Sequence, residues 1–135
     1  MSTPPDALPD SGPHEWLRRA RSNLARAKQP KLEEVFWEDL CFDAEQAAEK
    51  AVKAVLLFAG VVFPFVHDLG ELLTLVARAG IEVPQELWGA DQLSEFAVVT
   101  RYPGGRVPVD EDEYRKAVEL AEQTVRWAEG IIGDT

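Results

Sequence analysis

The sequence predicts an all-α protein, an up-and-down four- to five-helix bundle. Apolar residues recur at steps of three and four along most of the chain, which is the period of an amphipathic helix. The later prolines fall between these periodic stretches and mark helix boundaries, because proline disrupts a helix interior. They are Pro30, Pro64, Pro84, Pro103 and Pro108. The connections are short, which favours antiparallel neighbouring helices.

The length of 135 residues predicts a single domain. Four of the nine prolines lie in residues 1–13, where we expect a flexible leader. Residues 14–131 then form the helical domain. The formal net charge of −10 argues against salt-driven binding to a long nucleic acid backbone.

The sequence also indicates the cellular compartment of the protein. The longest apolar stretch, residues 52–65, is interrupted by Lys53, Gly60 and Pro64, so we expect no membrane span. No basic and apolar leader of a secretory signal is present. The single cysteine, Cys41, forms no internal disulfide and suits a reducing compartment. We therefore expect a cytoplasmic protein.

The first two expected helices cover residues 14–28 and 32–59. The second carries a seam of apolar and small residues at alternating steps of four and three, typical of a helix packed against neighbours. The seam residues are Trp37, Cys41, Ala44, Ala48, Ala51, Val55 and Phe58. The alanines would let neighbouring helices approach closely, and Gly60 is placed to end the helix.

Two further helices are expected between residues 68 and 101. Asp68 and Glu71 have the spacing of a capping box at a helix start, and Gly80 is placed to end that helix. The next helix follows Pro84 and runs to Arg101.

The last helix begins after a second capping box, formed by Asp110 and Glu113, and acidic residues dominate it. The window 18–31 is its opposite, with six basic residues and no acidic one. Two interpretations remain open. The basic strip is balanced across the bundle by the acidic last helix, or it faces an RNA or protein partner.

Three stretches together carry a family resemblance. They are "WLRRARSNLARA", "CFDAEQAAEKAVKAVLLFAGVVFPFVHDLGELL" and "RYPGG". The most specific positions are Gln46, Glu49, Lys50, Lys53, His67, Asp68, Arg101, Tyr102 and Pro103. With these stretches the chain resembles the HEPN family (higher eukaryotes and prokaryotes nucleotide-binding) over about residues 14–130.

The resemblance implies a helical bundle, usually a symmetric dimer and often encoded beside a minimal nucleotidyltransferase. Many relatives are ribonucleases, including toxins, and others are noncatalytic. The ribonucleases use an arginine for the phosphate and, after four to six intervening residues, a histidine for proton transfer. Here Arg101 would be the arginine, but positions 106–108 hold no histidine. The only histidines, His14 and His67, do not fit the spacing.

Two functional hypotheses follow. In the first, the protein is a noncatalytic HEPN-like interaction and nucleotide-binding module, a homodimer that partners a minimal nucleotidyltransferase in a toxin–antitoxin-type pair. In the alternative, it is a metal-independent ribonuclease with a degenerate motif that uses Arg101 with His67 as the base. The absent histidine favours the first. We expect no cofactor and no metal under either hypothesis.

The candidate catalytic residues are therefore Arg101 and His67. The candidate contacts for a nucleotide or RNA phosphate are Arg101, Tyr102, Arg106, Lys50 and Lys53. Each has a competing structural interpretation. Arg101 can cap the last turn of a helix. His67 can hold the loop before the helix that Asp68 caps. Lys50 and Lys53 are expected on a solvated helix face, where Glu49 and Lys53 have the spacing of an ion pair.

Overall fold

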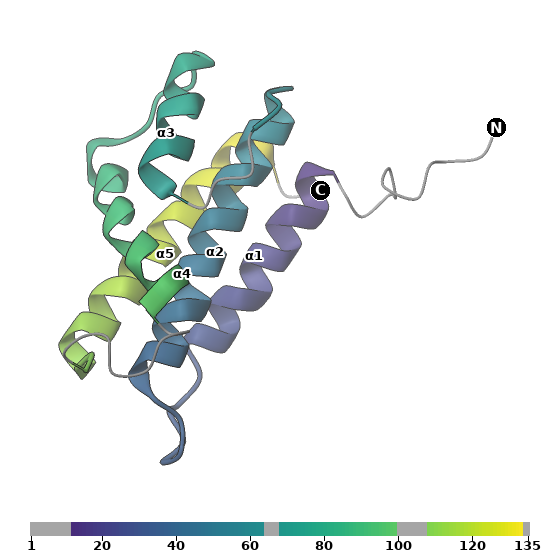
Figure 1. Ribbon diagram of the computed structural model, residues 1–135. Helices are drawn as coiled ribbons and strands as arrows, with labels where there is room; N and C mark the ends of the chain where they lie inside the picture. Colours follow the sequence, from purple (N-terminus) through teal and green to yellow (C-terminus); the bar gives the residue numbers. More distant parts are fainter. Residues whose placement is uncertain (1–11, 64–67, 100–107, 134–135) are drawn as a thin grey trace.

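The computed structural model describes residues 12–63, 68–99 and 108–133. Their elements are α1 (Pro13–Ala27), α2 (Trp37–Phe58), α3 (Leu69–Arg78), the 3-10 helix η3 (Gln85–Glu95), α4 (Phe96–Val99) and α5 (Glu111–Ile132). Within these ranges every element is helical, and the predicted all-α bundle is confirmed (Figure 1). The first helix starts at Pro13, which suits the first helical position because that position needs no N–H donor.

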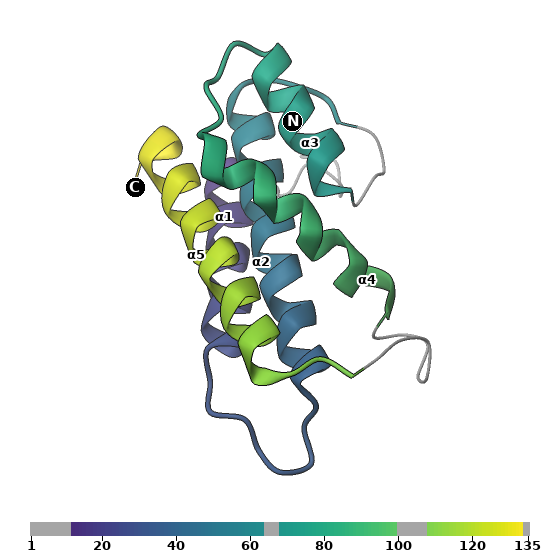
Figure 2. The same cartoon turned by 90° about the vertical axis from the view of Figure 1, so that its left-hand side faces the viewer.

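Helix α2 is the centre of the bundle and packs against α1, α5, α3, η3 and α4 (Figures 1 and 2). The predicted seam is confirmed along most of its length. Its alanines, together with Ala47 and Ala54, are fully buried, so neighbouring backbones approach α2 closely on several sides. Phe58 is the exception, because it is the last residue of α2 and remains half exposed.

The predicted start of this helix was wrong by several residues. Helix α2 begins at Trp37, and residues 28–36 connect it to α1. Leu32 and Phe36 are 67% and 70% exposed, so continuing the helix through them would bury no apolar face. The carboxylate of Asp39 accepts a hydrogen bond from the N–H of Phe36 and defines the start of the helix (3.3 Å).

The predicted helix starts at positions 68 and 110 are confirmed. Asp68 Oδ1 accepts a hydrogen bond from the N–H of Glu71 (3.0 Å). Asp110 Oδ1 accepts one from the N–H of Glu113 (2.8 Å). These side chains satisfy N–H groups that a helix leaves without partners in its first turn. Gly80 follows α3 with φ +90°, a conformation in which glycine is favoured.

The segment after Pro84 differs from the predicted helix. It forms the 3-10 helix η3, followed by α4, which is a single turn. Two side chains of η3 bind the first turn of α3: Asp91 accepts from the N–H of Gly70 (3.2 Å), and Ser94 Oγ accepts from the N–H of Leu69 (2.9 Å). These hydrogen bonds hold η3 against α3 (Figure 2). The hydrophobic periodicity of the sequence does not predict such a contact between two helices.

None of the described helices is long and apolar enough to cross a membrane.

Candidate functional site

The structure places only part of the predicted site. His67, Arg101, Tyr102 and Arg106 lie outside the described residues. Lys50 and Lys53 are described, and both lie on α2. The geometry of the predicted phosphate contacts is therefore visible at these two lysines.

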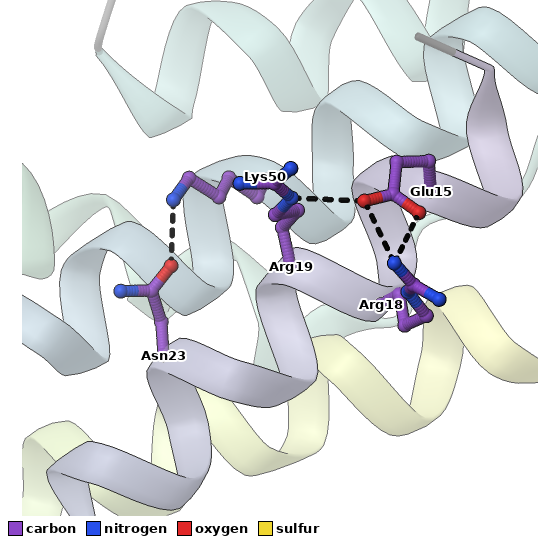
Figure 3. A network of polar contacts seen from close by, with 5 residues as sticks. All are labelled: Glu15, Arg18, Arg19, Asn23 and Lys50. Atoms are coloured by element: carbon purple, nitrogen blue, oxygen red, sulfur yellow. Dashed lines mark hydrogen bonds and ion pairs between the residues drawn. The ribbon is translucent and has the colours of Figure 1, made fainter. Parts of the chain in front are cut away.

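Lys50 is held at the contact between α2 and α1. Its Nζ donates a hydrogen bond to Oδ1 of Asn23 on α1 (2.7 Å; Figure 3). Asn23 is buried, and its Nδ2 donates to Oδ1 of Asp43 on α2 (3.4 Å). The predicted solvated position is therefore only partly correct, because Lys50 is half-buried and positioned by a side chain of the neighbouring helix.

Arg19 and Arg26 of α1 add positive charge near Lys50, and Arg18 lies beside Arg19 at a shared carboxylate. Arg18 and Arg19 pair with Glu15 at 3.0 Å and 2.9 Å (Figure 3). Arg26 pairs with Asp43 at 3.4 Å. All three guanidinium groups are exposed, whereas the two carboxylates are mostly covered. We call Arg18, Arg19, Arg26 and Lys50 the α1–α2 basic face.

The pKa of Lys50 is lowered from its ordinary value. Burial lowers it first, and the guanidinium groups of Arg19 and Arg26 lower it further, although Glu49 and Asp43 oppose them. Burial also raises the pKa of Asp43, against the opposing effect of Arg26. A bound anion would reduce the repulsion among these cations, so the arrangement favours an anionic ligand.

The basic strip of α1 divides between its two predicted roles. Arg21 pairs with Glu129 at 2.6 Å, and Lys28 pairs with Glu122 at 3.3 Å. These contacts balance one side of α1 against the acidic helix α5, as the first interpretation expects. The α1–α2 basic face turns to a different side of α1 and remains a candidate surface for a partner.

Lys53 was expected on a solvated face, and this was wrong. Its predicted ion pair with Glu49 is present at 2.8 Å, but the two side chains are only 8% and 6% exposed. Its ammonium lies 5.5 Å from the ring centre of Phe63 and 5.9 Å from that of Trp16. The aromatic side chains of α1 and of the segment after α2 cover this lysine, which periodicity on α2 alone cannot show.

Sequence reasoning missed Glu45, which is fully buried on α2. One oxygen accepts a hydrogen bond from Nε2 of Gln46 (2.7 Å), and Oε2 has no hydrogen-bond donor in the described part of the chain. Burial, and then the carboxylate of Glu49, raise the pKa of Glu45 to about 9. The only sequence signal is the spacing of Glu45, Glu49 and Lys53, which places them on one face of the helix.

The described residues show no candidate metal centre. Across the three described ranges, no group of three or more His, Cys, Asp and Glu residues could hold a metal ion. Cys41 is buried in the core. The α1–α2 basic face is a described surface suited to an anion.

Comparisons with known proteins agree with the fold. The family model described as the HEPN domain matches residues 13–131. Among solved structures, the chain is similar to ST0689, an archaeal HEPN homologue (25% identity, TM-score 0.73), over 91% of this chain and 99% of that one. It is also similar to TT1696 from Thermus thermophilus (31% identity, TM-score 0.76), over 87% of this chain and 96% of that one. A comparison with curated proteins gives no significant match.

Proposed function

Because the chain belongs to the HEPN domain family, we propose that it is a noncatalytic interaction and nucleotide-binding module. In this proposal it acts as a homodimer with a minimal nucleotidyltransferase, in a toxin–antitoxin-type pair. One observation carries the noncatalytic assignment: no histidine follows Arg101 after four to six intervening residues, at positions 106–108. Without that imidazole, an arginine can bind a phosphate but cannot transfer the proton of the attacking 2′-hydroxyl.

The α1–α2 basic face supports the nucleotide-binding part. Asn23 positions the Lys50 ammonium, and the exposed guanidinium groups of Arg19 and Arg26 act on it. Guanidinium and ammonium groups are the side chains that bind phosphate, through charge and forked or single donors. Lys50 therefore has the surroundings of a phosphate contact.

The noncatalytic assignment is tested by a ribonuclease assay on mixed single-stranded RNA. Loss of a general acid or base lowers a rate by about 10²–10⁴-fold. We therefore expect no cleavage above background from the purified chain. Robust cleavage that Arg101→Ala or His67→Ala abolishes would overturn the proposal and establish the ribonuclease alternative.

Nucleotide binding is tested separately, by titrating the chain with ATP and with a short single-stranded RNA. We expect weak, salt-sensitive binding that Lys50→Met reduces. Arg126→Ala on α5 is the matched control, because it removes one positive charge from an exposed position on another helix. Binding that both variants reduce equally would show a general charge effect and exclude a site at Lys50. We also expect Arg101→Ala to weaken binding while the fold is retained.

The partnership has its own test. A minimal nucleotidyltransferase encoded beside this chain should co-purify with it when the two are expressed together. Failure of a tagged chain to retain that partner would exclude the pair, whatever the outcome of the RNA assays.

A further inference from the structure

A groove lies between α3 and η3, on elements that do not contribute to the α1–α2 basic face. Its volume is about 600 Å³. Glu71, Leu75 and Arg78 are spaced to share one face of α3, and Trp88 and Asp91 are spaced to share one face of η3. The groove is therefore lined by two helical faces.

Hydrogen bonds hold the acidic end of the groove in place. Asp68 and Asp91 each accept a backbone N–H from the first turn of α3, from Glu71 (3.0 Å) and Gly70 (3.2 Å) respectively. A Cβ at Gly70 would come within 2.9 Å of Oδ1 of Asp91, so a glycine here lets η3 approach α3. The two aspartates are consequently fixed side by side and do not sample many positions.

The charge at this end selects a cation. Asp68, Glu71 and Asp91 all line the groove, and no ion pair involves any of them among the residues that the structure describes. The N–H groups of Gly70 and Glu71 already bind the two aspartates, so they are not available to an anion. Arg78 lies at the other end of α3, about 15 Å from Asp68 and about 10 Å from Glu71 along the helix axis at 1.5 Å per residue, so it offsets the acidic end only in part.

Trp88 makes the groove better suited to an arginine side chain than to other cations. Its side chain lies in the groove and is 37% exposed, which is unusual for so large an apolar side chain. A planar guanidinium can stack on an indole ring and pair with a carboxylate at the same time, and its methylene stem can pack on Leu75. Tryptophan and arginine are also the residues that dominate protein–protein contacts.

We propose that the groove between α3 and η3 binds an arginine side chain from an extended segment of a protein partner. The guanidinium stacks on Trp88 and pairs with Glu71 and Asp91, and the segment follows the groove along α3. This surface lies apart from the α1–α2 basic face and has the opposite charge. The chain would then contact a nucleotide and a basic protein segment on different surfaces.

The probe is a capped pentapeptide with two arginines, and its matched control is the same peptide with citrulline, which keeps the shape but removes the charge. Binding is followed through the indole N–H resonance of Trp88 in the assigned spectrum of the full chain. We expect the arginine peptide to shift this resonance saturably at low salt, and the citrulline peptide to leave it unchanged. If the arginine peptide causes no shift at about 5 mM, its Kd is too weak for a specific contact, and the proposal is overturned.

Variants locate the contact. Glu71→Gln is isosteric, and Glu71 is exposed, so the fold should be retained. The substitution should weaken peptide binding about two- to fivefold, as expected for the loss of one exposed ion pair. Glu86→Gln removes the same charge from an exposed position of η3 that does not line the groove, and it should bind like the parent. Equal weakening by both variants would show nonspecific attraction to an acidic protein and refute the proposal. So would spermidine shifting the Trp88 resonance as strongly as the peptide.

Discussion

The substitution Glu45→Gln tests whether the buried carboxyl of α2 carries a proton in the folded protein. Glu45 is fully buried, and burial together with the carboxylate of Glu49 raises its pKa from 4.5 to about 9. At neutral pH the folded protein therefore holds a proton on Glu45, and the protonated carboxyl can donate a hydrogen bond to Glu49. The unfolded chain loses that proton near pH 4.5.

The sign of the pH dependence follows from this difference. Between pH 4.5 and about 9 the folded state binds more protons than the unfolded state, so the free energy of unfolding falls as the pH rises. The slope is about 1.4 kcal/mol per pH unit, and at pH 7 the loss reaches about 3 kcal/mol as an upper limit. Glutamine is neutral at every pH and can donate to Glu49 in the same way. We expect Glu45→Gln to be more stable than the parent by about 1–3 kcal/mol at pH 7, with little difference near pH 5.

The assay is urea unfolding followed by circular dichroism at several values between about pH 5 and pH 8. Other titrating groups are common to both proteins and cancel in the difference. Glu119→Gln is the control, because Glu119 is exposed on α5 and should give no pH-dependent difference. A stability difference between Glu45→Gln and the parent that does not change with pH would refute the reasoning, as would a destabilised variant at every pH.

Two further predictions concern packing and assembly. Ala48 is fully buried on α2, so Ala48→Leu should lower the free energy of unfolding by about 1–3 kcal/mol through overpacking, whereas Ala25→Leu at an exposed position of α1 should not. An unchanged urea midpoint for Ala48→Leu would contradict the close approach of helices to α2. We expect a symmetric homodimer, because Phe36 and Val62 leave apolar surface exposed, and sedimentation should then show twice the 15.0 kDa chain mass. A single 15.0 kDa species at high protein concentration would exclude it.

The candidate site was only partly predictable from the sequence. Lys50 is a candidate phosphate contact in the sequence, but its partner Asn23 lies 27 positions away, and nothing in the spacing links them. Lys53 and Glu45 lie on a helix face that carries charged residues in the sequence. In the structure Trp16 and Phe63 cover Lys53, and Glu45 is fully buried. A single helix cannot reveal which of its charged residues its neighbours cover.

The sequence by itself determined the all-α class, the family and the helix starts at Asp68 and Asp110, because periodicity and capping depend on residues three or four positions apart. Tertiary structure decided what depends on distant residues. It decided that α2 starts at Trp37, where packing begins, and that Asp91 and Ser94 dock η3 as a 3-10 helix on α3. It also decided which charges are buried, because burial depends on the helices packed around a residue and not on its own place along the chain.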